Sequence, residues 1–269
     1  MKSSLSVLLA VLLSFRAPSP QAAAAGASPA DSLRCAAGER LVEGSALGDP
    51  VRPAFADCEE LHYSAYFGKL RVGSGEMRFH GRDSVRDRSA WRASFRIDGG
   101  IPGAHVHDTT VTWFDSVSYS SFRFVQNVHD PGYHANRDTQ IYPADRTYRT
   151  KDGETHASAE DPLDDMSLVY LVRTLPLEPG QCYVFKRYFK LDANPVVIHV
   201  VRRDTVEVPA GRFAAILLRP EIKTKGIFSE DGHAELWLAD DSRRTVLQLK
   251  TSLKFGSIRL QLRHVGHEE

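Results

Sequence analysis

Apolar and polar residues alternate along most of the chain after residue 58, and this pattern restricts the fold more than any other feature. In SAWRASFRI (89–97), every second residue is apolar and the residues between them are polar or charged. Side chains of a strand point alternately to its two faces, so the pattern predicts a strand with one dry and one wet face. Short turn sequences such as Gly99-Gly100 and Asp152-Gly153 separate further segments of this kind. We therefore expect a mainly β fold: a single large curved antiparallel sheet or an open β-barrel.

Two stretches break the alternation, because VVIHVV (196–201) and FAAILL (213–218) are apolar at nearly every position. A strand that is apolar on both faces has to be covered on both faces. The segment DPLDDMSLVYLVRTLPL (161–177) can supply that cover, since it is largely apolar and has helical signals at both ends. We predict one short packed helix at about 164–174.

The start of this helix has two candidate caps. Asp161 precedes a proline, which suits the first helical position, whereas Asp164 leaves a second aspartate in the first turn. The end is clearer, because the residue before Pro176 is biased away from helical backbone. Aspartates at a helix start are typical of caps, so we interpret the acidic cluster as structural rather than catalytic.

The first residues are typical of a secretory signal peptide. Lys2 precedes the apolar run LSVLLAVLLSF (5–15), which is too short to span a bilayer, and small residues around Ala24 offer a cleavage site. An uncleaved anchor is the competing interpretation. We expect a signal peptide at 1–24, an irregular lead-in at 25–57 with a short helical turn at 38–43, and a single β-rich domain at 58–266.

Charge and hydropathy reduce the number of possible functions and locations. The chain has 34 basic and 34 acidic residues, so it lacks the positive field that nucleic-acid binding demands. No window after the first segment has 18 uninterrupted apolar residues, and we expect no transmembrane segment in the mature chain. The protein is therefore expected to be exported, to the periplasm or to the extracellular space.

Export permits disulfides, and the chain has three cysteines, so at most one pair forms. The sequence does not choose among the three pairings. We favour Cys35 with Cys58, which flank a flexible Gly, Pro and Ala-rich segment, and we expect Cys182 to be a buried thiol at the start of a strand.

Histidines offer the one metal-binding hypothesis. His105 and His107 share a strand face, and His129 and His134 follow about twenty residues later, so a hairpin can bring them to one zinc ion. The spacing matches no known ligand motif, and solvated histidines are the simpler interpretation. The adjacent carboxylates of Asp240 and Asp241 suit a tight turn better than acid–base catalysis. The chain contains no P-loop, G-x-G-x-x-G, C-x-x-C or H-E-x-x-H motif.

Five segments in order resemble one family. DDMSLVYLVR (164–173) carries the main motif, and ELHYSAYFGKLRVGSG (60–75), VEVPAGRF (206–213), GHAELWLADDSRR (232–244) and KFGSIRLQL (254–262) accompany it. Together they resemble the domain-of-unknown-function 3108 (DUF3108) family of exported bacterial proteins, over roughly 58–264. The resemblance implies a β-rich envelope protein but no activity. It marks seven motif residues, to which we assign structural roles: Asp165, Ser167, Tyr170, Arg173, Gly211, Trp237 and Asp241.

We therefore expect a non-enzymatic cell-envelope protein without a cofactor, one that binds a hydrophobic or polymeric ligand or scaffolds a partner. Its partner would be a lipid, another apolar ligand or an envelope protein, because curved sheets leave a concave face that such ligands occupy. The alternative is a metal-dependent hydrolase that uses the region of His105, His107, His129 and His134.

Overall fold

The computed structural model describes residues 35–43, 55, 58–101, 103–222, 234–253 and 256–266. The signal peptide predicted at 1–24 lies outside the described residues. The strands are β1 (Arg40–Glu43), β2 (Glu60–Phe67), β3 (Leu70–Val85), β4 (Arg88–Ile101), β5 (Ala104–Phe114), β6 (Ser121–Asp130), β7 (Tyr133–Tyr142), β8 (Thr147–Arg149), β9 (Thr155–Ala157), β10 (Gln181–Phe185), β11 (Val196–Val208), β12 (Gly211–Glu221), β13 (Glu235–Ala239), β14 (Val246–Leu253) and β15 (Gly256–Gly266). One α-helix, α1 (Asp165–Val172), and two short 3₁₀ helices, η2 (Pro143–Asp145) and η3 (Leu191–Ala193), complete the described elements.

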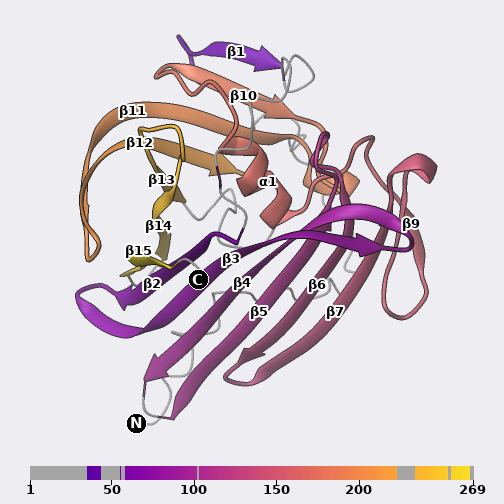
Figure 1. Ribbon diagram of the computed structural model, residues 1–269, viewed down its shortest axis with the longest axis horizontal. Coiled ribbons are helices and arrows are strands. Elements are labelled where there is room, and N and C mark those ends of the chain that lie inside the picture. The colour runs from indigo at the N-terminus through magenta and orange to yellow at the C-terminus, as the bar shows by residue number, and fades with distance from the viewer. Residues whose placement is uncertain are drawn as a thin grey trace, which may run out of the picture.

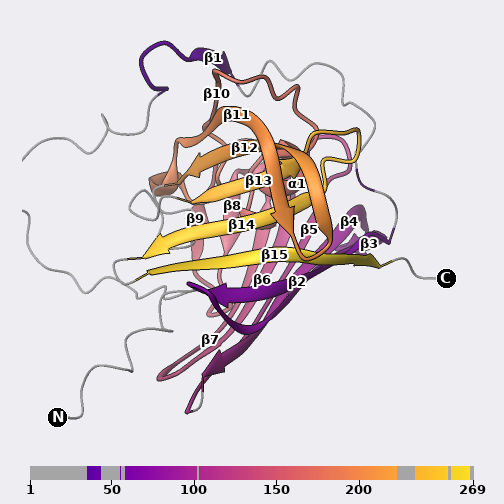
Figure 2. The same cartoon turned by 90° about the vertical axis from the view of Figure 1, so that its left-hand side faces the viewer.

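All strands belong to one sheet with the order β1-β10-β11-β12-β13-β14-β15-β2-β3-β4-β5-β6-β7-β8-β9. Neighbours are antiparallel except β1 and β10, which are parallel. The first and last strands of this order are edges, so the described sheet is open rather than closed into a barrel. It curls around α1, with β10–β14 on one side of the helix and β3–β7 on the other (Figures 1 and 2). This confirms the predicted fold class.

Bulges and close glycine contacts accompany the curvature. In the pairing of β2 with β3, Ala65 lies opposite Gly73 but Tyr66 lies opposite Arg71, so a bulge falls at Val72, directly before Gly73. Gly73 also pairs with Gly99 on β4. A Cβ atom at Gly73 would lie 2.3 Å from the Asp98 carbonyl oxygen, so only glycine permits this close approach of the two strands.

Helix α1 lies inside the curve of the sheet, closest to β4 and β5. Its residues Met166–Val172 are all buried. The N-cap is Asp164, and Asp161 adopts a left-handed backbone conformation before the helix starts. The structure thus confirms the predicted helix and selects one of the two candidate caps. No helix among the described residues has the length and apolar character that crossing a membrane requires.

Aromatic rings fill the space between α1 and the sheet. Tyr170 of the helix lies 4.8 Å from Phe55, 5.6 Å from Phe79 and 5.7 Å from Phe114, between ring centroids. Trp91 and Tyr119 extend the same cluster. Such ring pairs contribute about 0.5–1.5 kcal/mol each beyond their buried area, so this cluster fixes the helix to β3, β4 and β5.

The apolar stretch VVIHVV lies in β11 and is buried on both faces, as its pattern predicts. Ile198 and Val200 point into the main core, where α1 also packs. On the other face, Val197 forms a separate small cluster with Cys182, against which Cys35 packs. The cover on this outer face is therefore the segment before β1, which the sequence analysis did not foresee.

Two expectations about that segment are wrong. Residues 38–43 do not form a helical turn, because Arg40–Glu43 pairs as strand β1 with β10. The disulfide joins Cys35 to Cys182, and Cys58 is a free thiol. The physical reason is the strand order: β1 lies beside β10, whereas Cys58 precedes β2, and β11 to β15 separate β2 from β10.

This disulfide closes a long loop, since its cysteines are 147 residues apart. In the chain-entropy model such a crosslink stabilises the fold by about 5 kcal/mol, and removing a native disulfide costs roughly 2–5 kcal/mol. We predict that Cys35→Ala lowers the free energy of unfolding by that amount in urea denaturation. Cys58→Ala is the matched control and should change it little. Equal effects of both substitutions would contradict the pairing.

Candidate functional site

The N-terminus of α1 is held by a closed set of hydrogen bonds. The fully buried Asp164 carboxylate accepts from the backbone N–H groups of Met166 and Ser167 at 2.8 and 2.9 Å, and from the Thr112 hydroxyl at 2.5 Å. The Ser167 hydroxyl accepts from the Asp164 N–H at 2.9 Å, which completes a capping box. Burial raises the pKa of Asp164 to about 6. In these contacts Ser167 is the N3 residue of the capping box, and Asp164 is the N-cap.

The next motif residue, Asp165, accepts a hydrogen bond from the Tyr188 hydroxyl at 2.9 Å. Tyr188 is buried and lies between β10 and η3, beyond the end of the helix. Burial and the nearby charge of Asp165 raise the pKa of Tyr188 well above its usual value, so the hydroxyl remains a donor. Asp165 therefore ties the first turn of α1 to the chain that follows β10.

Arg173, at the end of α1, forms a buried ion pair with Glu59. Its two terminal nitrogens donate to the two Glu59 carboxylate oxygens, each at 2.7 Å. The side chains are 0% and 7% exposed. The guanidinium also donates to the Arg243 carbonyl oxygen at 3.1 Å and lies 5.1 Å from the centre of the Phe55 ring. This one residue joins the helix to the start of β2 and to the turn before β14.

Tyr170 lies inside the core. The residue is fully buried, and its hydroxyl has no hydrogen-bond partner among the described residues. Burial raises the pKa of Tyr170, so the ring stays neutral. The aromatic cluster around it explains the placement, because its rings surround the helix on the side of β3 to β5.

The other motif residues lie elsewhere in the sheet and have separate contacts. Gly211 begins β12 after a tight turn with a positive φ of 135°. Trp237 of β13 is 7% exposed and packs under the guanidinium of Arg202 at 5.4 Å. Asp241 accepts from the N–H groups of Arg243 and Arg244 at 2.9 and 3.0 Å, which is the turn role predicted for it.

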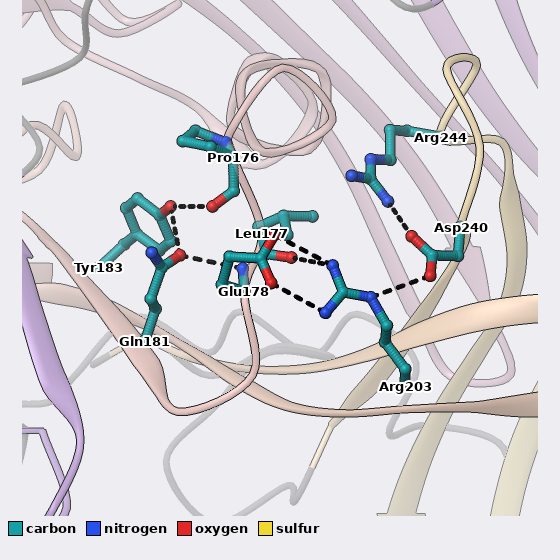
Figure 3. Close-up of polar contacts among 8 residues, drawn as sticks. All are labelled: Pro176, Leu177, Glu178, Gln181, Tyr183, Arg203, Asp240 and Arg244. Atoms are coloured by element: carbon teal, nitrogen blue, oxygen red, sulfur yellow. Dashed lines mark hydrogen bonds and ion pairs between the residues drawn. The ribbon is translucent and has the colours of Figure 1, made fainter.

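Figure 3 shows an ion-pair network on the surface around Arg203 of β11. Arg203 donates to Glu178 at 2.8 Å and to Asp240 at 2.9 Å, and Arg244 donates to the other oxygen of Asp240 at 2.8 Å. The network ties the segment after α1 to β11 and to the turn after β13. Asp240 is thus an ion-pair partner of two arginines.

The four candidate histidines all lie on the outer face of the sheet, in two pairs. His105 and His107 of β5 contact Asp98 at 3.5 and 2.6 Å. His129 and His134 lie opposite each other on β6 and β7, with ring centroids 4.5 Å apart. Among the described residues, the three-residue groups with metal-ligand spacing lie elsewhere, so the structure does not assemble these four into one metal site.

One of those groups consists of Cys35, Glu39 and Cys182, and the disulfide accounts for it. Cysteine binds metals as the thiolate, which a disulfide removes. Glu39 instead accepts from the buried His199 imidazole, with 2.7 Å between Oε2 and Nδ1. The other group, Glu60, His62 and Glu76, lies on the outer face of β2 and β3.

Two carboxylates on the inner face were missed by the sequence analysis. Asp108 of β5 and Asp130 of β6 are 3% and 1% exposed. Asp108 accepts from the His129 N–H at 2.9 Å with one oxygen, while its other oxygen and both oxygens of Asp130 lack partners among the described residues. Burial and the charge of Asp108 raise the pKa of Asp130 to about 7. The sequence HVHDTTVTWF holds only a weak signal: Asp108 is in phase with Val106 and Phe114, which face inward.

The inner face of β5 to β7 changes character along the strands. Next to the helix, Phe124 belongs to the main core and Thr112 contacts the helix cap. One step further, Thr110 pairs with Gln126, and beyond them lie Asp108 and Asp130. The apolar core therefore gives way to a polar strip, which also includes Arg137 and Tyr133 of β7.

The buried ion pair between Arg173 and Glu59 should be important for stability. Removing one partner of a buried pair leaves an uncompensated charge and costs about 3–5 kcal/mol. Arg173→Met should lower the free energy of unfolding by that amount in urea denaturation, with Glu59→Gln close behind. Arg203→Met, which breaks the exposed network, should leave the denaturation midpoint almost unchanged, because surface ion pairs contribute little. A midpoint equally insensitive to both substitutions would contradict the role assigned to Arg173.

The raised pKa of Asp130 predicts an unusual pH dependence of the folding stability. A carboxyl with a higher pKa in the folded protein than in the unfolded chain binds more protons when folded, so stability falls as pH rises from about 4 to about 7. Asp130→Asn should remove this loss and raise the free energy of unfolding at pH 8 by up to about 4 kcal/mol.

Asp138 is the matched control for that experiment. Its hydrogen bond and ion pair with Arg123 lower its pKa, so its stabilising contribution is present at pH 8. Asp138→Asn should therefore lower the melting temperature at pH 8, whereas Asp130→Asn raises it. A decrease for both substitutions would contradict the assignment of Asp130.

One solved structure supports the fold, and two others match with lower TM-scores. A β-barrel-like DUF1849 protein from Brucella abortus superposes with a TM-score of 0.50 at 12% identity, covering 80% of this chain and 98% of that one. An inferred exported protein with a YmcC-like fold from Bacteroides fragilis gives a TM-score of 0.37 at 11% identity, covering 81% and 100%. An inferred lipoprotein from Parabacteroides distasonis gives 0.35 at 8% identity, covering 79% and 98%.

The comparison with curated proteins gives no match. The family comparison is decisive instead. The family described as "Protein of unknown function (DUF3108)" matches residues 62–263, which is most of the chain and nearly all of the described sheet. The chain therefore belongs to the DUF3108 family.

Proposed function

We propose that this protein is a non-enzymatic binding module of the cell envelope whose binding site includes the buried polar strip on the inner face of β5, β6 and β7. The observation that carries the proposal is the pair Asp108 and Asp130, which presents three carboxylate oxygens without partners among the described residues. Buried polar groups in proteins nearly always have partners, so such oxygens indicate a ligand that donates hydrogen bonds.

Two features of the chain support a location outside the cytoplasm. The first residues have the pattern of a signal peptide, and the disulfide between Cys35 and Cys182 requires an oxidising compartment. We place the mature protein in the periplasm or outside the cell, with cleavage near Ala24. In that compartment the available partners are lipids, polymers of the envelope and other envelope proteins.

The polar strip favours a polymer over a lipid chain. The apolar part of the inner face is already occupied by α1 and its aromatic cluster. The remaining part carries Asp108, Thr110, Gln126 and Asp130, with Val106 and Val128 between them. Acceptors interspersed with small apolar side chains suit a chain of hydroxyl- or amine-bearing units, such as a polysaccharide, whereas a fatty acyl chain would leave the carboxylates unsatisfied.

The proposal is tested by binding to soluble polymers. Isothermal titration calorimetry of the mature chain with chito-oligosaccharides, which carry amines and hydroxyls, should show binding, and vesicles of phosphatidylglycerol should show none. Hydrogen bonds to a charged group contribute about 1.5–3 kcal/mol, so the double substitution Asp108→Asn and Asp130→Asn should weaken binding by roughly 10- to 100-fold.

Asp138→Asn is the control, because that aspartate lies on the outer face of β7 and is engaged by Arg123. It should retain full affinity. Binding that is the same in the double variant and the wild type, or binding to vesicles alone, would contradict the proposal.

A further inference from the structure

A second group of polar side chains lies on the opposite, outer face, where β15, β2 and β3 are neighbours. Glu60 and His62 alternate with the buried Leu61 and Tyr63 on β2, so both point outward. Glu76 of β3 and His264 of β15 lie directly opposite His62 in the strand register. Three adjacent strands thus deliver two carboxylates and two imidazoles to one place.

The distances within this group are short. His62 Nε2 lies 2.6 Å from Glu60 Oε1, and His62 Nδ1 lies 3.9 Å from Glu76 Oε2. One ligand atom from each of these three residues lies within 4.8 Å of the others. The His264 ring stacks on the His62 ring, with centroids 4.2 Å apart and planes inclined by 16°.

Charge and burial also suit a cation. The three chelating side chains are 18% to 37% exposed, so they are partly removed from water yet open to a solute. Two carboxylates close together on neighbouring strands repel each other. Arg78 lies beside them, with its Nη1 atom 3.9 Å from Glu60 Oε2.

We propose that Glu60, His62, Glu76 and His264 form a binding site for a divalent transition-metal ion of the Zn²⁺ type. Imidazole nitrogen and carboxylate oxygen are the ligands that zinc takes in proteins, in sets of three or four. The site lies outside the surface assigned to the polymer and is independent of it. It joins β15 to β2 and β3, so the bound ion would fasten β15 in place.

The test uses the tag-free mature chain, stripped of metal with EDTA and titrated with ZnCl₂ in a calorimeter. We expect one zinc ion per chain with a micromolar or lower dissociation constant, and a higher melting temperature with zinc, because a ligand that binds only the folded state stabilises it. Glu76→Gln and His264→Ala each remove one proposed ligand, and each should weaken binding at least 10-fold.

His134→Ala is the control, since it removes an exposed histidine from the other outer-face group. It should leave zinc affinity unchanged. X-ray absorption of the zinc-loaded protein should show nitrogen and oxygen ligands only. No binding, sulfur in the ligand shell, or loss of affinity in the His134 variant instead of the Glu76 and His264 variants would overturn the proposal.

Discussion

A sheet that curls without closing has an inner face that something must cover, and in this protein helix α1 provides the cover. The helix has only eight residues, which is too short to be stable alone in water. Its stability therefore comes from packing inside the curve, and the curve in turn depends on the helix to fill it. The aromatic cluster around Tyr170 and the buried contacts at both helix ends make this dependence mutual.

The contacts at the two ends of α1 attach it to different strands of the sheet. At the start, Asp164 and Ser167 satisfy the first N–H groups of the helix and connect it to β5 and β6 through Thr112 and Ser121. At the end, Arg173 connects it to Glu59, just before β2. A helix so short offers few other attachment points, which explains why a motif of polar residues within one turn of each end accompanies an apolar helix.

Because α1 fills only part of the curve, the inner face of β5 to β7 extends beyond it. Polar side chains begin there, at Thr110 and Gln126, and lead to Asp108 and Asp130. Sheet, helix and polar strip thus follow one another in a physical order: the sheet needs a helix to fill its curve, the helix has a finite length, and the buried polar strip lies beyond its end. The histidine and glutamate group on the outer face is separate from this order.

Local patterns in the sequence predict local features well. Period-two alternation predicts the strands, and the aspartates before Met166 together with Pro176 predict the helix. Features that join distant segments are not predictable in this way. Cys35 lies next to Cys182 only because β1 lies beside β10, and His264 contacts His62 only because β15 pairs with β2. The buried aspartates are not predictable from the local pattern either, because polar side chains stand on both faces of their strands.

Native-state hydrogen exchange measured by mass spectrometry tests the central claim most directly, since it reports how often α1 opens without the sheet. If the helix and the curved sheet depend on each other, the amides of 168–173 exchange only by global unfolding, at the same free energy as those in the middle of β4 and β5. If those helix amides exchange orders of magnitude faster while the amides of β4 and β5 stay protected, the sheet is stable without the helix, and the account is wrong.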